Sequence, residues 1–212
     1  MKNLEYKIKV IDDFLKKDDF EALCGLNLES NNENEFKVYH NKINNNQIIY
    51  STINQDLLKK IHNNYFTKAT NILKEICPEK LSLYDYSDFT VIVTKKNSKF
   101  PIHDDTPDKL LSGVIYLYPE NNSGTFFYSD KKGSNKTSIE WKPNRAVFFS
   151  RKEKETWHSY EGNGTNQRVV LVYNLMTNRI KEVFKIENKN YLIGNFRFKI
   201  NPYLFKYFKK TI

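Results

Sequence analysis

Residues 167–175, Gln-Arg-Val-Val-Leu-Val-Tyr-Asn-Leu, are the last of several short segments that decide the fold of this chain. They are rich in β-branched and aromatic side chains, which is the composition of a β-strand. Six earlier segments share this composition and are separated by Gly, Pro, Asn and Ser: Phe89–Thr94, Leu110–Tyr118, Thr125–Tyr128, Ser138–Trp141, Arg145–Ser150 and Thr156–Tyr160. Short strands at this spacing, with no helical pattern between them, predict an antiparallel sandwich or barrel.

The amino-terminal part of the chain has a different pattern. Residues 6–11 alternate apolar and Lys side chains, which predicts a strand, and residues 14–23 form a short amphipathic segment. Between residues 55 and 76, apolar side chains recur at three- and four-residue steps. This spacing predicts a helix, with Asn54 as its N-cap. We therefore expect an α+β fold dominated by its β core, with the long helix covering one sheet from outside.

Length and composition narrow the class of protein. A chain of 212 residues with 39% hydrophobic and 15% aromatic residues suggests one globular domain with a small appendage, and argues against disorder. Two cysteines, Cys24 and Cys77, cannot form a disulfide framework. No apolar run approaches the roughly 18 residues of a membrane helix. The sequence predicts a soluble protein with no membrane partner, and its free thiols suggest a cytoplasmic location.

The net charge of +9 is unevenly distributed. Residues 181–212 contain eight basic and two acidic side chains, interleaved with aromatic residues. Basic and aromatic side chains together can bind nucleic acid, but they also occur where a hairpin and a terminal helix pack their aromatic side chains on a core. We favour the second interpretation. It divides the chain into residues 1–180, with a β core at about 85–176, and a carboxyl-terminal extension, 181–212, that packs on this core.

One histidine lies in a pattern that suggests metal binding. His103 and Asp105 belong to the sequence Phe-Pro-Ile-His-Asp-Asp at 100–105. In an extended segment these two side chains point to the same side, and Asp104 points to the other side, toward solvent. A His and a carboxylate are two of the three ligands in the facial triad of non-haem Fe(II) sites. The same pattern occurs by chance in many proteins, so a third ligand is needed.

His158 is the candidate for that third ligand. A turn at residues 162–164, Gly-Asn-Gly, separates it from the segment that begins with Gln167 and Arg168. If both segments form a hairpin centred on Asn163, His158 and Arg168 face each other across two strands, with Cβ atoms about 5 Å apart. The guanidinium of Arg168 can then bind a carboxylate with two parallel hydrogen bonds. Arginine is scarce in this lysine-rich chain, with five residues, which makes its position here more informative.

Several other features suggest no chemistry. His40 and His62 stand alone, the first in a loop-like region and the second on the polar side of the predicted helix, so we expect both at the surface. Stretches rich in Asn at 31–34 and 44–46 predict turns.

The HxD pattern, a His 53 residues later and a basic residue ten beyond it resemble the Fe(II)/2-oxoglutarate-dependent oxygenases, in particular their small prolyl-4-hydroxylase-like group. The resemblance covers about residues 85–176, and the lead-in segment at 6–15 is also similar. It implies a double-stranded β-helix (jelly-roll, cupin-like) core with supporting amino-terminal helices. It also implies the cofactors Fe(II), 2-oxoglutarate and O2, with ascorbate as a further candidate.

The resemblance assigns roles to individual residues. His103, Asp105 and His158 would hold the iron, and Arg168 would bind the distal carboxylate of 2-oxoglutarate. Thr125 and Tyr116 are weaker candidates for contact with this co-substrate, because ordinary sheet packing also explains them.

The chain departs from the family pattern at two positions. Thr94 stands where some relatives have a Tyr that contacts 2-oxoglutarate, and Arg168 stands where prolyl hydroxylases commonly have Lys. Collagen-type specificity is therefore not implied. Asp105 favours hydroxylation, because related halogenases lack this carboxylate.

Two functions from different classes remain open at this stage. The first is a dioxygenase that hydroxylates an unactivated C–H bond of a peptidyl side chain or a small molecule and releases succinate and CO2. The second is a cupin-like metal- or sugar-binding jelly-roll module without 2-oxoglutarate turnover. A nucleic-acid substrate is not favoured, since the Arg-Asn-Thr-Arg pattern of the nucleic-acid demethylases is absent.

Overall fold

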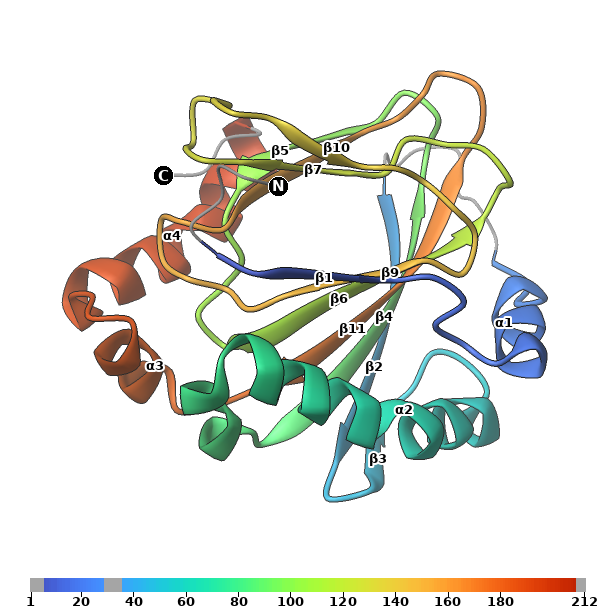
Figure 1. The fold of residues 1–212 in the computed structure, drawn as a ribbon, viewed down its shortest axis with the longest axis horizontal. Coiled ribbons are helices and arrows are strands. Elements are labelled where there is room, and N and C mark those ends of the chain that lie inside the picture. Colours follow the sequence, from blue (N-terminus) through green and yellow to red (C-terminus); the bar gives the residue numbers. More distant parts are fainter. Residues whose placement is uncertain (1–5, 29–35, 209–212) are drawn as a thin grey trace.

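The computed structural model of the protein describes residues 6–28 and 36–208. Two antiparallel sheets face each other, with α2 across the outer face of the larger one and α3 and α4 at one side (Figure 1). In chain order, the elements are β1 (Ile8–Ile11), α1 (Lys17–Cys24), β2 (Phe36–Asn44), β3 (Gln47–Tyr50), α2 (Gln55–Ile76), the 3-10 helix η1 (Pro78–Leu83), β4 (Tyr86–Thr94), β5 (Lys99–His103), β6 (Lys109–Tyr118), β7 (Thr125–Tyr128), β8 (Thr137–Ile139), β9 (Ala146–Phe149), β10 (Trp157–Glu161), β11 (Arg168–Met176), α3 (Ile180–Ile186) and α4 (Tyr191–Phe208).

The sheet order confirms the predicted jelly-roll core within an α+β fold. The larger sheet has the order β1-β9-β6-β11-β4-β2-β3, and the smaller sheet has the order β5-β10-β7-β8. Strands β4 to β11 divide equally between the two sheets, as in a double-stranded β-helix. Each of the segments from 89 to 175 that we predicted as strands contributes to this core, with ends shifted by a few residues.

The sequence did not predict β2, β3 and β5 as strands. The Asn-rich stretch at 44–46 is the turn between β2 and β3, where Asn45 and Asn46 have φ angles of 47° and 59°. Asn tolerates this left-handed conformation better than most residues, so the turn prediction was right. The other predicted turn, at 31–34, lies outside the described residues.

Helix α2 supports the larger sheet, as its periodicity predicted. The side chain of Asn54 accepts hydrogen bonds from the backbone N–H groups of Asp56 and Leu57, which caps the first turn. The buried face of the helix packs against the outer side chains of the central strands and includes Leu58, Ile61, Tyr65, Ala69, Ile72 and Leu73.

The prediction that His62 lies at the surface was wrong. Its side chain is 3% exposed, contacts the rings of Phe66 and Phe89, and hydrogen-bonds to the side chain of Asn46. The apolar stripe of α2 is wide enough to include this position. His40 is exposed, as predicted.

The carboxyl-terminal segment folds into α3 and α4, with no strand hairpin within the described residues. Val183 and Phe184 of α3 are buried. Gly194 of α4 lies directly against the Phe184 ring, where a Cβ atom would come within 2.1 Å of that ring. None of the helices described is both long and apolar enough to span a lipid bilayer.

Candidate active site

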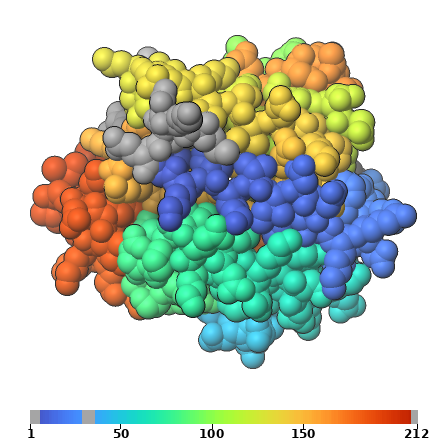
Figure 2. Space-filling view, viewed as in Figure 1, coloured from blue at the N-terminus to red at the C-terminus, as the bar shows by residue number. Residues whose placement is uncertain are grey.

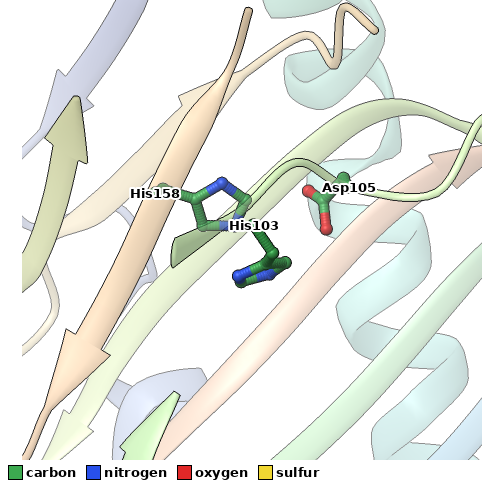
Figure 3. A group of neighbouring side chains, drawn as sticks. All are labelled: His103, Asp105 and His158. Atoms are coloured by element: carbon green, nitrogen blue, oxygen red, sulfur yellow. The ribbon is translucent and has the colours of Figure 1, made fainter. Parts of the chain in front are cut away.

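Three side chains, two on strands of the smaller sheet and one just after such a strand, converge at the opening between the two sheets. His103 ends β5, Asp105 lies two residues later, and His158 lies in β10 (Figure 3). β5 and β10 are antiparallel neighbours with His103 directly opposite His158, so their ring centroids lie 4.2 Å apart. One potential ligand atom from each of the three residues lies within 4.8 Å of the others. The predicted triad is therefore assembled in space.

Hydrogen bonds orient all three ligands. Nδ1 of His103 lies 2.9 Å from the carbonyl oxygen of Pro101, and Nδ1 of His158 lies 3.0 Å from that of Thr156. A carbonyl can only accept, so each Nδ1 carries a proton and Nε2 is the ring nitrogen available to face a metal. Such contacts fix the ring orientation in metal sites.

The carboxylate of Asp105 has two partners of its own. Lys109 Nζ donates to Oδ1 at 2.7 Å, and Ser112 Oγ donates to Oδ2. Burial alone would raise the pKa of Asp105, but the charge and hydrogen bond of Lys109 outweigh it, with the neighbouring imidazoles acting in the same direction, and lower the pKa. Burial also lowers the pKa of His103 to about 3, and the neighbouring His158 adds to this effect. Near pH 7 the site thus offers a neutral imidazole from His103 beside an ionised carboxylate. Two imidazoles and one carboxylate form the donor set of a non-haem Fe(II) centre.

Replacing Ser112 with alanine is expected to weaken metal binding 10- to 100-fold, the usual cost of losing a contact that orients a metal ligand. The exposed Ser138 provides the matched control, Ser138→Ala. Anaerobic titration of Fe(II) against a competing chelator measures both. Equal affinities in the two variants would show that Asp105 does not depend on Ser112.

Arg168 lines the same cavity, but it lies on a strand of the larger sheet and not, as the sequence predicted, on the strand that neighbours β10. β10 pairs with β5 and β7, whereas β11 pairs with β4 and β6. The predicted hairpin between His158 and Arg168 is therefore wrong. The connection through 162–167 carries the chain from one sheet to the other, so the two residues approach from opposite walls. Thr94 is the neighbour of Arg168 in β4.

The guanidinium of Arg168 is buried without a compensating charge. The residue is 4% exposed, and no described carboxylate pairs with it. Its Nε has no hydrogen-bond partner. Its nearest aromatic partner is Tyr160, with the guanidinium carbon 3.8 Å from the ring centroid. Burial lowers the pKa of Arg168, although the two tyrosines Tyr116 and Tyr160 oppose this. A buried, unpaired cation is costly, so this position suits an anionic ligand.

A cavity of about 210 Å³ connects Arg168 to the metal ligands. Thr125 lines it, and Tyr116 donates its hydroxyl hydrogen bond to Thr125 Oγ1 at 2.9 Å. The Tyr116 ring stacks on Trp141, with centroids 4.6 Å apart. Of the two weaker candidates, Thr125 therefore borders the cavity, and Tyr116 orients the Thr125 side chain. Tyr160, which also lines the cavity, was missed, although it lies two residues after His158 on the same strand and so faces the same side.

A buried ionic network lies beneath the metal ligands. Arg151 Nε donates to the backbone carbonyl of Asp105 at 3.1 Å, and its other nitrogens pair with Glu187 and Glu153. Glu153 also pairs with Arg197 of α4. The network continues to the Lys80 ammonium, which contacts Glu187 at 2.7 Å. The loop that carries Asp105 is thus tied to both carboxyl-terminal helices.

Asp104 belongs to this network, so the prediction that it faces solvent was wrong. Its side chain is 5% exposed and accepts hydrogen bonds from Arg197, at 3.0 Å, and from the backbone N–H of Lys154. Strand alternation ends with β5 at His103, and the following residues turn Asp104 toward α4.

Replacing Arg197 with methionine is expected to destabilise the fold by about 3 kcal/mol, because it leaves Glu153 and Asp104 buried with one cation fewer. Lys199→Met, at an exposed position of the same helix, removes the same charge and is expected to have little effect. Urea unfolding of both variants measures the difference. Similar midpoints would show that the network does not hold α4.

Solved structures of other proteins share this fold. A prolyl-4-hydroxylase from Pseudomonas putida is 16% identical, with a TM-score of 0.53, over 82% of this chain and 94% of that one. A 2OG-Fe(II) oxygenase family oxidoreductase from Burkholderia pseudomallei is 14% identical, with a TM-score of 0.57, over 80% of this chain and 84% of that one. IDO from Bacillus thuringiensis is also 14% identical, with a TM-score of 0.58, over 81% of this chain and 90% of that one. No protein-family model matches the chain, and no curated protein matches it in sequence. At these identities the similarities establish the fold.

Proposed function

We propose that this protein is a non-haem Fe(II)/2-oxoglutarate-dependent dioxygenase that hydroxylates a C–H bond of a peptidyl side chain or a small molecule. One observation carries the proposal: an oriented two-histidine, one-carboxylate site shares a cavity with the buried, unpaired guanidinium of Arg168. The fold similarity to 2OG-Fe(II) oxygenases and prolyl-4-hydroxylases supports the same reaction class.

The residues present fit both groups. His103, Asp105 and His158 would hold Fe(II) through two imidazole nitrogens and a carboxylate oxygen. Arg168 would bind the distal carboxylate of 2-oxoglutarate, with Thr125 beside it. When bound, iron and 2-oxoglutarate supply the oxidising chemistry with O2, and succinate and CO2 leave as co-products.

The protein contributes orientation and exclusion of water. Thr156 and Pro101 fix the imidazole rings through their backbone carbonyls, and Ser112 fixes the carboxylate. Apolar side chains line the cavity between the metal ligands and Arg168: Val114, Phe149 and Val170. This apolar lining strengthens the pairing of Arg168 with an anionic ligand, because it lowers the local dielectric constant.

A cupin-like metal- or sugar-binding module is the alternative. Its metal ligands could be the same three residues, but it gives no reason to bury Arg168 without a counter-charge. The two functions differ in a direct assay. The dioxygenase releases succinate from 2-oxoglutarate, slowly and without substrate, in a reaction that requires both Fe(II) and O2. Absence of succinate from folded, Fe(II)-loaded protein would favour the binding module.

A further inference from the structure

Helix α4 forms one wall of a second cavity at the metal site. This cavity, of about 180 Å³, extends from His103 and Asp105 to the inner face of the helix, including Phe198, Asn201 and Phe205. Phe100 links the helix to the metal ligands, because its ring lies 5.0 Å from that of Phe205 and 4.5 Å from that of His103. The inner face of α4 therefore lies next to the metal ligands His103 and Asp105.

The outer face of α4 is apolar and exposed. Nine large hydrophobic side chains of the described residues are exposed, and six of them lie on this helix. Their exposed fractions are between 59% and 75%. We call these six the α4 patch: Leu192, Ile193, Phe196, Tyr203, Tyr207 and Phe208. An exposed cluster of this kind is unusual for a soluble surface and indicates a binding site.

The charge of α4 indicates the kind of partner. The helix contains no Asp or Glu, and its exposed face adds Lys199 and Lys206 to the α4 patch. The carboxyl-terminal segment, coloured orange to red, forms the left edge of the molecule in Figure 2. A surface with apolar anchors and only positive charge is complementary to an acidic partner with apolar side chains.

The helix is firmly attached, so the patch is not a loosely packed tail. Arg197 is buried between Asp104 and Glu153, and Gly194 allows close contact with Phe184. Every strong attachment lies on the inner face, which leaves the outer face available.

From these observations we infer that the α4 patch is a docking surface for an acidic polypeptide whose chain passes over the metal site. This inference rests on the proposed function, and it selects a polypeptide as the substrate. Polypeptides supply the aliphatic and aromatic side chains that suit Leu192, Ile193 and Phe196. Nucleic acid requires several phosphate contacts, whereas the described part of α4 exposes two lysines.

The test is a selection from a random twelve-residue peptide library on the full chain, loaded with Mn(II) and 2-oxoglutarate to fill the site without turnover. We expect the enriched peptides to be acidic and to contain apolar residues. An enriched peptide, labelled with fluorescein, is expected to bind at least tenfold more weakly to the double variant Phe196→Ser/Tyr203→Ser. The matched control, Ile49→Ser/Tyr50→Ser, removes two exposed apolar side chains of β3 and should bind as wild type does.

Several results would overturn the inference. These are no enrichment, enriched peptides that are not acidic, or equal binding by both double variants. A wild-type dimer that the α4 variant converts to a monomer would assign the patch to a second copy of the chain. If the wild-type protein bound phosphatidylserine vesicles or single-stranded DNA but no peptide, and the α4 variant lost that binding, the patch would be assigned to a membrane or to nucleic acid.

The succinate assay separates this inference from the proposed function. Succinate release by wild-type protein without any peptide binding contradicts the docking surface alone. Peptide binding that depends on the α4 patch, without succinate release, contradicts the proposed function alone.

Discussion

Replacing Arg168 with methionine is expected to raise the dissociation constant for 2-oxoglutarate at least 100-fold. Methionine fills a similar volume but removes the only guanidinium, among the described residues, that lines the cavity of about 210 Å³. Truncating one partner of a buried charge pair costs about 2–5 kcal/mol. A 100-fold loss corresponds to about 2.7 kcal/mol, which lies within this range. Equilibrium dialysis of labelled 2-oxoglutarate against anaerobic Fe(II) protein measures the effect.

Arg179→Met is the matched control for this variant. Arg179 lies at the start of α3, where it contacts the carboxylate of Asp85, and its side chain is 38% exposed. It has the same charge as Arg168 but no contact with the cavity. Wild-type affinity in Arg168→Met, or an equal loss in both variants, would contradict the assignment of Arg168 as the carboxylate-binding residue.

Replacing His158 with alanine is expected to weaken Fe(II) binding by more than 100-fold. The loss should exceed the 10- to 100-fold expected for a residue that only orients a ligand, because a ligand itself is removed. His158 faces His103 across the β5–β10 pair. Among the described residues, no other His or Cys lies close enough to His103 and Asp105 to replace it. Anaerobic titration against a chelator measures the affinity, and His40→Ala, at an exposed position, is the control. Unchanged affinity in His158→Ala would contradict the metal site.

The identity of the site residues could be predicted from the sequence because their signals are local. His103 and Asp105 are two residues apart, and the β-branched segments around them define strands. The sequence therefore predicted which residues the structure brings together in the candidate site and which fold holds them. The apolar stripe of α2 was equally visible, but its sequence pattern placed His62 on the polar side of the helix, whereas the buried face includes it.

The arrangement of the site depends on contacts between distant segments, and the sequence predicted this less well. The symmetry of 158 and 168 about Asn163 suggested a hairpin, because the shortest connection usually joins neighbouring strands. In the jelly roll this connection crosses between sheets instead. Strand alternation likewise ends at His103, the last residue of β5, so it gave the wrong direction for the side chain of Asp104. The partner of Asp104, Arg197, lies 93 residues away, and no local pattern connects the two.

The most direct test of the proposed function is anaerobic calorimetric titration of 2-oxoglutarate into the wild-type protein, with and without Fe(II). The proposed function predicts saturable binding that requires the metal, because the triad and Arg168 would hold opposite ends of one molecule. A folded, Fe(II)-loaded protein that does not bind 2-oxoglutarate would contradict the proposed dioxygenase and leave a metal-binding jelly roll.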